Sequence, residues 1–324
     1  MLRRDLFGLT AVAGLSAPSV LRAQDAAWPD RPVRLVVPWP AGGGTDIIAR
    51  IFQPKLQELL GQPVVIENRG GASGSIGAGE AARATPDGYT WLLAFDTEAT
   101  NQATMRLPYK VMQAFAPVGL VATGPIVLAT GQKSPWRTLP DLVAAAKAAP
   151  DTISYATAGV GTLAHVSNTL LQQLGGFKLT HTPYRGGAPA AQAVLSGEVP
   201  LFMTPIPPAI QHIRAGTLRP LAVTTEAESR HLPGVKSFAQ QGFPGFEAPT
   251  WYAFLGRAGA PKTVIRKMSA ALTAALSAPE VRTRIEEQGV DVVASGPERT
   301  RRFLNAEVER WGRVIRDNNI IADG

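Results

Sequence analysis

The chain has 324 residues, no cysteine and a formal net charge of +7, from 32 basic and 25 acidic residues. The lack of cysteine excludes disulfides, thiolate metal ligands and a cysteine nucleophile. The densest group of basic residues lies in one amphipathic segment where acidic residues are interleaved: Arg299, Arg301, Arg302, Arg310, Arg313 and Arg316. This pattern predicts a solvated helix face and no nucleic-acid site.

Residues 1–23 have the layout of a secretory signal. Arg3 and Arg4 precede an apolar run from Leu6 to about Leu21, and small residues lead to Ala23, after which we expect cleavage. The run is shorter than the ~18 apolar residues of a membrane span. The paired arginines do not decide between the twin-arginine and general export routes, and a buried N-terminal helix is the alternative. Roughly 300 residues would remain, which favours two lobes over one core.

Strand-like and helix-like segments alternate along the rest of the chain. The apolar runs that predict strands cover 33–39, 63–68, 89–95, 125–130, 152–157, 201–205, 219–225 and 250–256. The helical patterns start at Thr45 as a cap, cover 141–149 and 163–174, and follow Pro261. The last helix opens on a capping-box pattern of Ser295 and Glu298. The alternation predicts an α/β architecture with mainly parallel sheets.

The stretch WPAGGGTDIIAR, residues 39–50, places three glycines between a strand and a helix. Glycines let a ligand approach the main chain, and the first amides of a helix have no partners within the helix. Together with the helix dipole, these amides form a potential anion site. A plain glycine-rich turn is the alternative interpretation of this segment alone.

A second strand–glycine–helix segment covers residues 153–171, with Gly159, Gly161, Thr162 and His165 around its turn. Two helix N-termini from different parts of the chain would then hold one ligand. The spacing of Gly159, Gly161 and Ala164 also matches a dinucleotide fingerprint, which needs an acidic residue ~20 positions later. No Asp or Glu lies between Asp151 and Glu198, and no glycine loop ends in Gly-Lys-Ser/Thr. We therefore expect neither NAD nor a P-loop nucleotide, and no cofactor.

Hydrolytic and metal motifs are absent from the sequence. The stretch GASGS at 71–75 lacks the last glycine of a G-x-S-x-G elbow, and the four histidines have no zinc-ligand spacing. We expect no catalytic residue and no metal site, although a Ser/His/Asp set assembled across the fold remains an alternative. For His165 we expect a ligand contact or a capping role, and for Asp46 a role in bracing its loop.

Six segments in order resemble the substrate-binding proteins of tripartite tricarboxylate transporters, the Bug-type periplasmic receptors. They are WPDRPVRLVVPWPAGGGTDIIAR, VVIENRGGASGSIGAGEAARATPDGYTWLL, YATAGVGTLAHVSNTLL, HTPYRGGAPAAQAVLSGEVPLFMT, RAGTLRPLAVTT and GFPGFEAPTWYAFLGRAGAP. The resemblance implies a two-lobed, type II periplasmic binding fold, with lobe one at 28–122 and 226–324 and lobe two at 123–225. It also implies a monomer that closes around a small carboxylate and delivers it to a membrane permease. A receptor for a membrane kinase and an exported α/β hydrolase are the alternatives.

The resemblance also implies which residues hold the carboxylate, mainly through main-chain amides and water. In the first loop they are Trp39, Pro40, Ala41, Gly42, Gly43, Gly44, Thr45 and Asp46; in the second, Ala158, Gly159, Gly161, Thr162 and His165. Further candidates are Ser73, Asp96, Thr97, Tyr184 and Thr204.

The chain departs from the family pattern at two places. Pro200 and Thr204 stand where the family often has an acid, and Asp96 and Glu98 stand where it more often has small hydroxyl residues. Asp96 would contact an ammonium or hydroxyl of the ligand if it faces the cleft, and would otherwise be solvated. Trp39 and Tyr184 are candidates to flank an aromatic ring. We expect a dicarboxylic or an aromatic carboxylic acid as the ligand.

Overall fold

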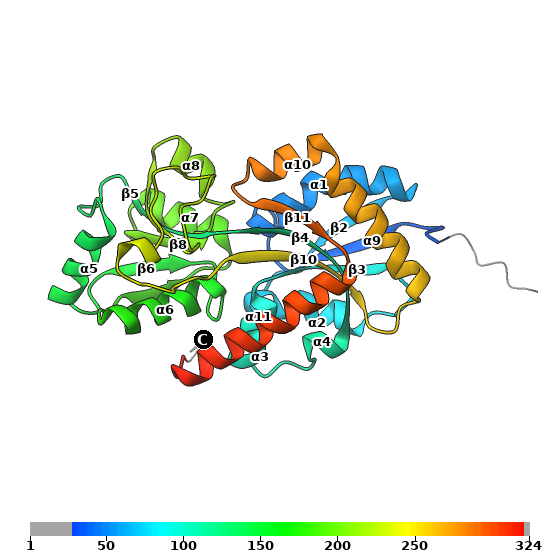
Figure 1. The fold of residues 1–324 in the computed structure, drawn as a ribbon, viewed down its shortest axis with the longest axis horizontal. Coiled ribbons are helices and arrows are strands. Elements are labelled where there is room, and N and C mark those ends of the chain that lie inside the picture. Colours follow the sequence, from blue (N-terminus) through cyan, green and yellow to red (C-terminus); the bar gives the residue numbers. More distant parts are fainter. Residues whose placement is uncertain (1–27, 321–324) are drawn as a thin grey trace, which may run out of the picture.

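The computed structural model describes residues 28–320, so the predicted signal at 1–23 lies outside the described part. Two lobes lie side by side, each built on one sheet (Figure 1). In lobe one the strand order is β11 (Asp291–Ser295), β4 (Phe115–Gly124), β10 (Thr250–Arg257), β3 (Thr90–Phe95), β1 (Val33–Val37) and β2 (Val64–Asn68). In lobe two it is β7 (Thr180–Pro183), β6 (Ser154–Thr157), β8 (Leu201–Pro205), β5 (Ile126–Gly131) and β9 (Leu218–Val223).

Both sheets are mixed. β1 runs parallel to β2 and β3, and β6 runs parallel to β7 and β8. The strands nearest the crossings are antiparallel to their neighbours: β10 to β3 and β4, and β5 to β8 and β9. The parallel arrangement predicted from the strand–helix alternation thus holds for the strands joined through helices. The ladder beside the crossings is antiparallel.

Successive side chains of a strand point to opposite faces of the sheet. Helices cover both faces of the lobe-one sheet. Val33, Leu35 and Val37 of β1 pack into the apolar cluster under helices α1 (Gly44–Leu60), α9 (Lys262–Ser277) and α10 (Pro279–Glu286). Val36 points into the cluster on the opposite face. That face is covered by α2 (Ser75–Arg83), α3 (Thr97–Thr104), α4 (Val111–Ala114) and α11 (Pro297–Asp317).

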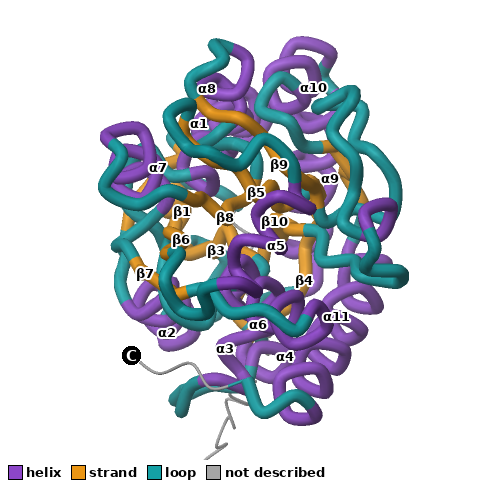
Figure 2. Tube along the Cα trace, turned by 90° about the vertical axis from the view of Figure 1, so that its left-hand side faces the viewer, coloured by secondary structure: helices purple, strands orange, loops and turns teal. Residues whose placement is uncertain are grey.

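Lobe two carries α5 (Leu139–Ala148), α6 (Leu163–Gly175), α7 (Gly187–Ser196) and α8 (Ile210–Arg214). Figure 2 looks onto this lobe, with its strands near the centre and the helices around them. Two single-turn 3₁₀ helices, Ala72–Gly74 and Ala239–Gln241, complete the elements. Within residues 28–320, none of the helices combines the length and the apolar character needed to cross a bilayer.

Two of the predicted helix caps are wrong. α1 starts at Gly44 with Gly43 as its N-cap, so Thr45 lies inside the helix. α11 starts after Gly296, because Ser295 is still the last residue of β11, and the Ser295 hydroxyl lies 3.1 Å from the Thr300 hydroxyl instead. A true capping box occurs at α5, between Thr138 and Asp141.

The chain passes between the lobes at the ends of long strands. β4 ends at Gly124 and β5 begins at Ile126, so the first crossing takes one residue. After β9 the chain stays on lobe two: Ser237 bridges to Val223, and the Ala248 amide donates to the Thr224 carbonyl at 2.9 Å. These contacts favour a second boundary near residue 249 over the one predicted at 225.

One apolar cluster extends through both lobes. It contains Trp251 and Trp311 from lobe one and Leu163 and Leu201 from lobe two. Because interiors are close-packed, a cluster shared in this way packs the two lobes against each other.

Candidate functional site

A small cavity, partly open to solvent, lies between the lobes. It opens at the carboxyl ends of β1, β3, β6 and β8, where ligands bind in α/β sheets. Lobe one contributes Trp39, Pro40, Ala41, Gly43, Gly44, Thr45, Phe95 and Tyr252 to its walls, and lobe two contributes Ala158, Gly186, Gly187, Ala188, Pro189, Thr204, Pro205 and Pro208. None of the described residues that line it is charged.

Hydrogen bonds to the Asp46 carboxylate fix the loop from β1 to α1. The Asp46 carboxylate accepts hydrogen bonds from the Gly42 amide at 2.9 Å, from Arg50 Nε at 2.9 Å and from Asn68 Nδ2 at 3.0 Å. Burial alone would raise the pKa of Asp46, but the bonds from Arg50, Gly42 and Asn68 outweigh it and lower the pKa. Gly42 has φ +79°, a conformation that favours glycine. The Asp46 side chain thus braces the loop, while Gly44 and Thr45 of the first turn of α1 line the cavity.

The second helix start at the cavity belongs to α7. Gly186 is its N-cap, and the Gly186 amide donates to the Ala158 carbonyl at 3.0 Å. A Cβ on Gly187 would lie 3.1 Å from Pro208 Cγ, and a Cβ on Gly44 would lie 3.5 Å from Pro208 Cδ. The starts of α1 and α7 therefore face each other across one proline ring. A Cβ at either glycine would come within 3.2 Å of a neighbouring side chain, so both positions are tightly packed.

The loop from β6 to α6 forms hydrogen bonds within itself. Ala158 lines the cavity, whereas Gly161, Thr162 and His165 line neither it nor its mouth. The Thr162 hydroxyl caps α6 by accepting from the His165 amide at 3.3 Å, and the Gly161 amide donates to His165 Nδ1 at 3.2 Å. The loop's own side chains therefore take up its amide donors.

A pair of stacked histidines, one buried and one half-buried, lies next to this loop. The rings of His165 and His181 stack with their centroids 4.0 Å apart, and His181 Nε2 lies 2.7 Å from the Thr157 hydroxyl. Burial, followed by the nearby His165, lowers the pKa of His181 to about 3. The lowered pKa keeps the His181 ring neutral, and this ring stacks on His165 at the start of α6.

Three further candidates line the mouth of the cleft, a second space next to the cavity. They are Ser73, Gly159 and Tyr184, and Trp39, Pro40 and Ala158 border both spaces. The Ser73 hydroxyl donates across the cleft to the Val160 carbonyl. The Tyr184 hydroxyl donates to Glu198 at 2.7 Å, so it is already paired.

Asp96 and Thr97 lie behind the cavity wall. The Asp96 side chain is 1% exposed and accepts from the Thr250 hydroxyl at 2.5 Å. Burial raises the pKa of Asp96 to about 8, against the Thr250 bond and with the help of the Glu307 charge. Neither Asp96 nor Thr97 lines the cavity or its mouth. The structure thus places Asp96 neither against the cavity nor in solvent.

Three polar atoms of cavity-lining residues are buried and have no hydrogen-bond partner: Trp39 Nε1, Thr204 Oγ1 and the Tyr252 hydroxyl. Native structures satisfy almost all buried polar groups, so unpaired donors around a cavity indicate a missing partner. Within residues 28–320, no three or more His, Cys, Asp or Glu residues gather as a possible metal site.

Several cavity residues were missed from the sequence. Phe95 and Tyr252 come from neighbouring strands, and their rings lie 5.1 Å apart. Gly186 and Gly187 lie in TPYRGGAPAA, where the Gly-Gly pair before an alanine-rich run was a readable strand–glycine–helix signal. No comparable signal existed for Tyr252, because only the pairing of β10 with β3 brings it to the cavity.

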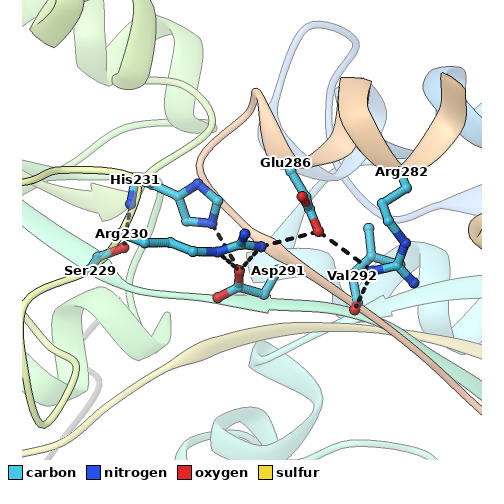
Figure 3. Close-up of polar contacts among 7 residues, drawn as sticks. All are labelled: Ser229, Arg230, His231, Arg282, Glu286, Asp291 and Val292. Atoms are coloured by element: carbon cyan, nitrogen blue, oxygen red, sulfur yellow. Dashed lines mark hydrogen bonds and ion pairs between the residues drawn. The ribbon is translucent and has the colours of Figure 1, made fainter. Parts of the chain in front are cut away.

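An ionic cluster joins the lobes outside the cavity (Figure 3). Arg230 and His231, from the segment after β9, reach Asp291 at the start of β11. Arg230 Nε lies 2.6 Å and His231 Nε2 3.0 Å from Asp291 Oδ1, and Arg230 Nη2 lies 3.1 Å from Glu286 Oε1. Arg282 binds the same Glu286 oxygen at 3.5 Å.

The chain is similar to known receptors over nearly its whole length. Residues 48–320 match the tripartite tricarboxylate transporter family receptor. Protein BugT of Bordetella pertussis is 36% identical over 310 residues, which cover 95% of this chain and 94% of BugT. The solved periplasmic binding protein BugD is 32% identical with a TM-score of 0.86, covering 91% of this chain and 99% of BugD.

Two further similar structures hold ligands. One is an R. palustris protein with adipate, 32% identical with a TM-score of 0.87 over 91% of this chain and 99% of that one. The other is MatC from Rhodopseudomonas palustris with bound malate, 30% identical with a TM-score of 0.84 over 89% of this chain and 100% of MatC. The two sheets with their interlobe cavity and these matches agree: the chain belongs to the tripartite tricarboxylate transporter receptor family, and it is an extracytoplasmic solute receptor and not an enzyme.

Proposed function

We propose that this receptor binds a small dicarboxylic or aromatic carboxylic acid in the cavity between its lobes and delivers it to a membrane permease. The observation that carries the proposal is the meeting of two helix N-termini, those of α1 and α7, at one cavity with no charged side chain. Backbone amides and two helix dipoles stabilise a carboxylate without a basic residue.

A short dicarboxylate suits this geometry best. Gly44 and Gly187 approach the same Pro208 ring, so the two anion-binding helix starts are separated by the span of a small molecule. The similar structures that contain adipate and malate hold acids of this kind. Each helix start would take one carboxyl group, with Trp39 and Phe95 against the carbon chain.

An aromatic acid is the second candidate, because of the aromatic wall. Trp39 meets Phe95 edge-on at 5.7 Å, and Phe95 lies 5.1 Å from Tyr252. An aromatic ring bound here would gain edge and face contacts with this group.

The delivery step follows from the two-lobed shape. We propose export with cleavage after Ala23, lobe one at 28–122 and from about 250 to the C-terminus, and lobe two between them. A closed form, with the acid held between the two lobes, would be presented to the permease.

The test is a thermal-shift screen of the protein without residues 1–23. The panel contains succinate, malate, adipate, citrate, benzoate, 4-hydroxybenzoate, aspartate and glucose. A ligand that binds only the folded state raises the melting temperature by mass action. We expect a rise with a dicarboxylate or an aromatic acid and none with glucose. A response to glucose alone, or to no acid at all, would overturn the proposal.

A further inference from the structure

Two buried hydroxyl groups line the cavity without a hydrogen-bond partner, one from each lobe. Tyr252 on β10 is 0% exposed and Thr204 on β8 is 1% exposed. A buried hydroxyl that bonds to nothing destabilises the folded state, so such groups usually meet water, an ion or a ligand.

The Tyr252 hydroxyl lies at the start of α1. A Cβ on Gly44 would be 3.2 Å from it. The backbone groups that α1 presents there are amides, which donate and cannot accept the tyrosine proton. The Asp96 carboxyl behind the wall accepts from Thr250 through Oδ2, its Oδ1 has no hydrogen-bond partner, and neither oxygen bonds to Tyr252. A ligand bound in the cavity can supply an oxygen as this acceptor, because Tyr252 lines the cavity.

The Thr204 hydroxyl lies on the lobe-two side of the same cavity. Its residue pairs with Val127 of β5, which fixes its backbone. In the parallel ladder Ala156 pairs with Phe202, so Thr204 lies two residues beyond that pair, level with Ala158. Ala158 accepts the Gly186 amide at the start of α7. The Tyr252 hydroxyl thus lies at the start of α1, and Thr204 lines the lobe-two wall of the same cavity together with Gly186 and Gly187 of the α7 start.

We propose that the hydroxyls of Tyr252 and Thr204 donate hydrogen bonds to oxygens at the two ends of the bound acid, and so select acids with oxygen at both ends over acids with an apolar tail. The inference rests on the proposed function and adds the class of ligand. An acid with an apolar tail would leave one hydroxyl buried and unpaired, and a site built around hydrogen bonds rejects such an analogue.

Matched pairs of acids test the selection: succinate against butyrate, adipate against hexanoate, and 4-hydroxybenzoate against benzoate. Titration calorimetry on the protein without residues 1–23 gives a preference ratio for each pair. We expect the native protein to prefer the first member of at least one pair by about tenfold or more.

The variants Tyr252→Phe and Thr204→Val remove the two hydroxyls and keep the side-chain shape. Each should lower the affinity for the preferred acid by about tenfold and reduce the preference ratio, and Thr204→Ser should restore both. The control is Tyr89→Phe, because the Tyr89 hydroxyl is bound to Asp30 and Tyr89 lines neither the cavity nor its mouth. Melting curves without ligand show whether each variant folds.

Unchanged preference ratios in both folded variants would overturn this inference, even if the affinity for all acids fell together. A native protein that binds these acids with no preference within any pair would overturn it too. A native protein that binds no acid would overturn the proposed function itself, which is a different result.

Discussion

The loops before α1 and α6 share one sequence pattern, but only the first leaves the start of its helix open to the cavity. Both follow a buried strand, both contain glycines, and both open a helix. Before α1, one acidic side chain, Asp46, braces the loop and leaves the helix start open to the cavity. Before α6, Thr162 and His165 bond to the loop itself. The glycine pattern therefore indicates a helix start, and the neighbouring side chains decide whether it is available to a ligand.

The largest expected effect is at the two open helix starts. Gly187→Val places a branched side chain against Pro208, where a Cβ alone would already lie 3.1 Å away, so the start of α7 or Pro208 must shift in the cavity wall. We expect the ligand affinity to fall by about 100-fold, which corresponds to ~3 kcal/mol of overpacking. Calorimetry with the acid found in the thermal-shift screen measures this loss.

Gly296→Val is the matched control, because a Cβ on Gly296 meets nothing within 4 Å. Its affinity should equal that of the native protein. If the Gly187→Val variant binds the ligand with native affinity, α7 is not part of the site. The loop before α6 would then be the candidate for the second helix N-terminus.

The second expected effect is on the pH dependence of stability, and it concerns Asp96, which lies behind the cavity wall. The folded pKa of Asp96, about 8, is above its ordinary 3.8, so Asp96 binds a proton on folding. Its contribution to stability is fully present below the unfolded pKa and is lost as the pH rises through 8. Between pH 5 and 7 the native protein should lose ~1.4 kcal/mol of unfolding free energy per pH unit relative to Asp96→Asn.

Urea unfolding of both proteins at pH 5, 6, 7 and 8 gives this difference. Glu98, whose pKa burial also raises to about 8, acts in the same direction and leaves a slope in the variant. If the unfolding free energies of the two proteins change equally with pH, Asp96 is ionised in the folded state.

A smaller effect is expected at the closed loop. Thr162→Ala removes the N-cap of α6 and should lower the free energy of unfolding by ~1 kcal/mol. The ligand affinity should stay within about threefold of the native value, since an alanine here changes no cavity contact. Denaturant unfolding and calorimetry on one preparation compare the two quantities. A large loss of affinity with native stability would place the α6 loop in the binding site after all.

The smallest effect is expected at the ionic cluster of Arg230 and Asp291. Their side chains are 60% and 48% exposed, and exposed pairs of this kind stabilise proteins by ~0.2–1 kcal/mol. A double-mutant cycle of Arg230→Gln and Asp291→Asn should give a coupling energy in this range that shrinks with added salt. A coupling energy above ~2 kcal/mol would show that the cluster, and not the shared apolar packing, holds the lobes together.

Local patterns in the sequence predicted much of the fold. The apolar runs at 33–39 and 250–256 are strands, and the order of six motifs identified the family, which the comparisons confirm. The caps at Thr45 and Ser295 were wrong by one or two residues, because a cap depends on the backbone angles at a single position. In the site, the loop at 39–46 was readable from its glycines. The start of α7 and the aromatic wall were not recognised.

The sequence by itself determined the alternation of strands and helices, the glycine-rich helix starts and the family, because each depends on residues close together in the chain. The tertiary structure alone decided which helix starts face the cavity and which polar atoms around it lack partners. Tyr252 lies at the start of α1 only because β10 pairs with β3. Gly187 lies near that helix start only because both Gly44 and Gly187 pack against Pro208. Such contacts join residues far apart in sequence, and no local pattern encodes them.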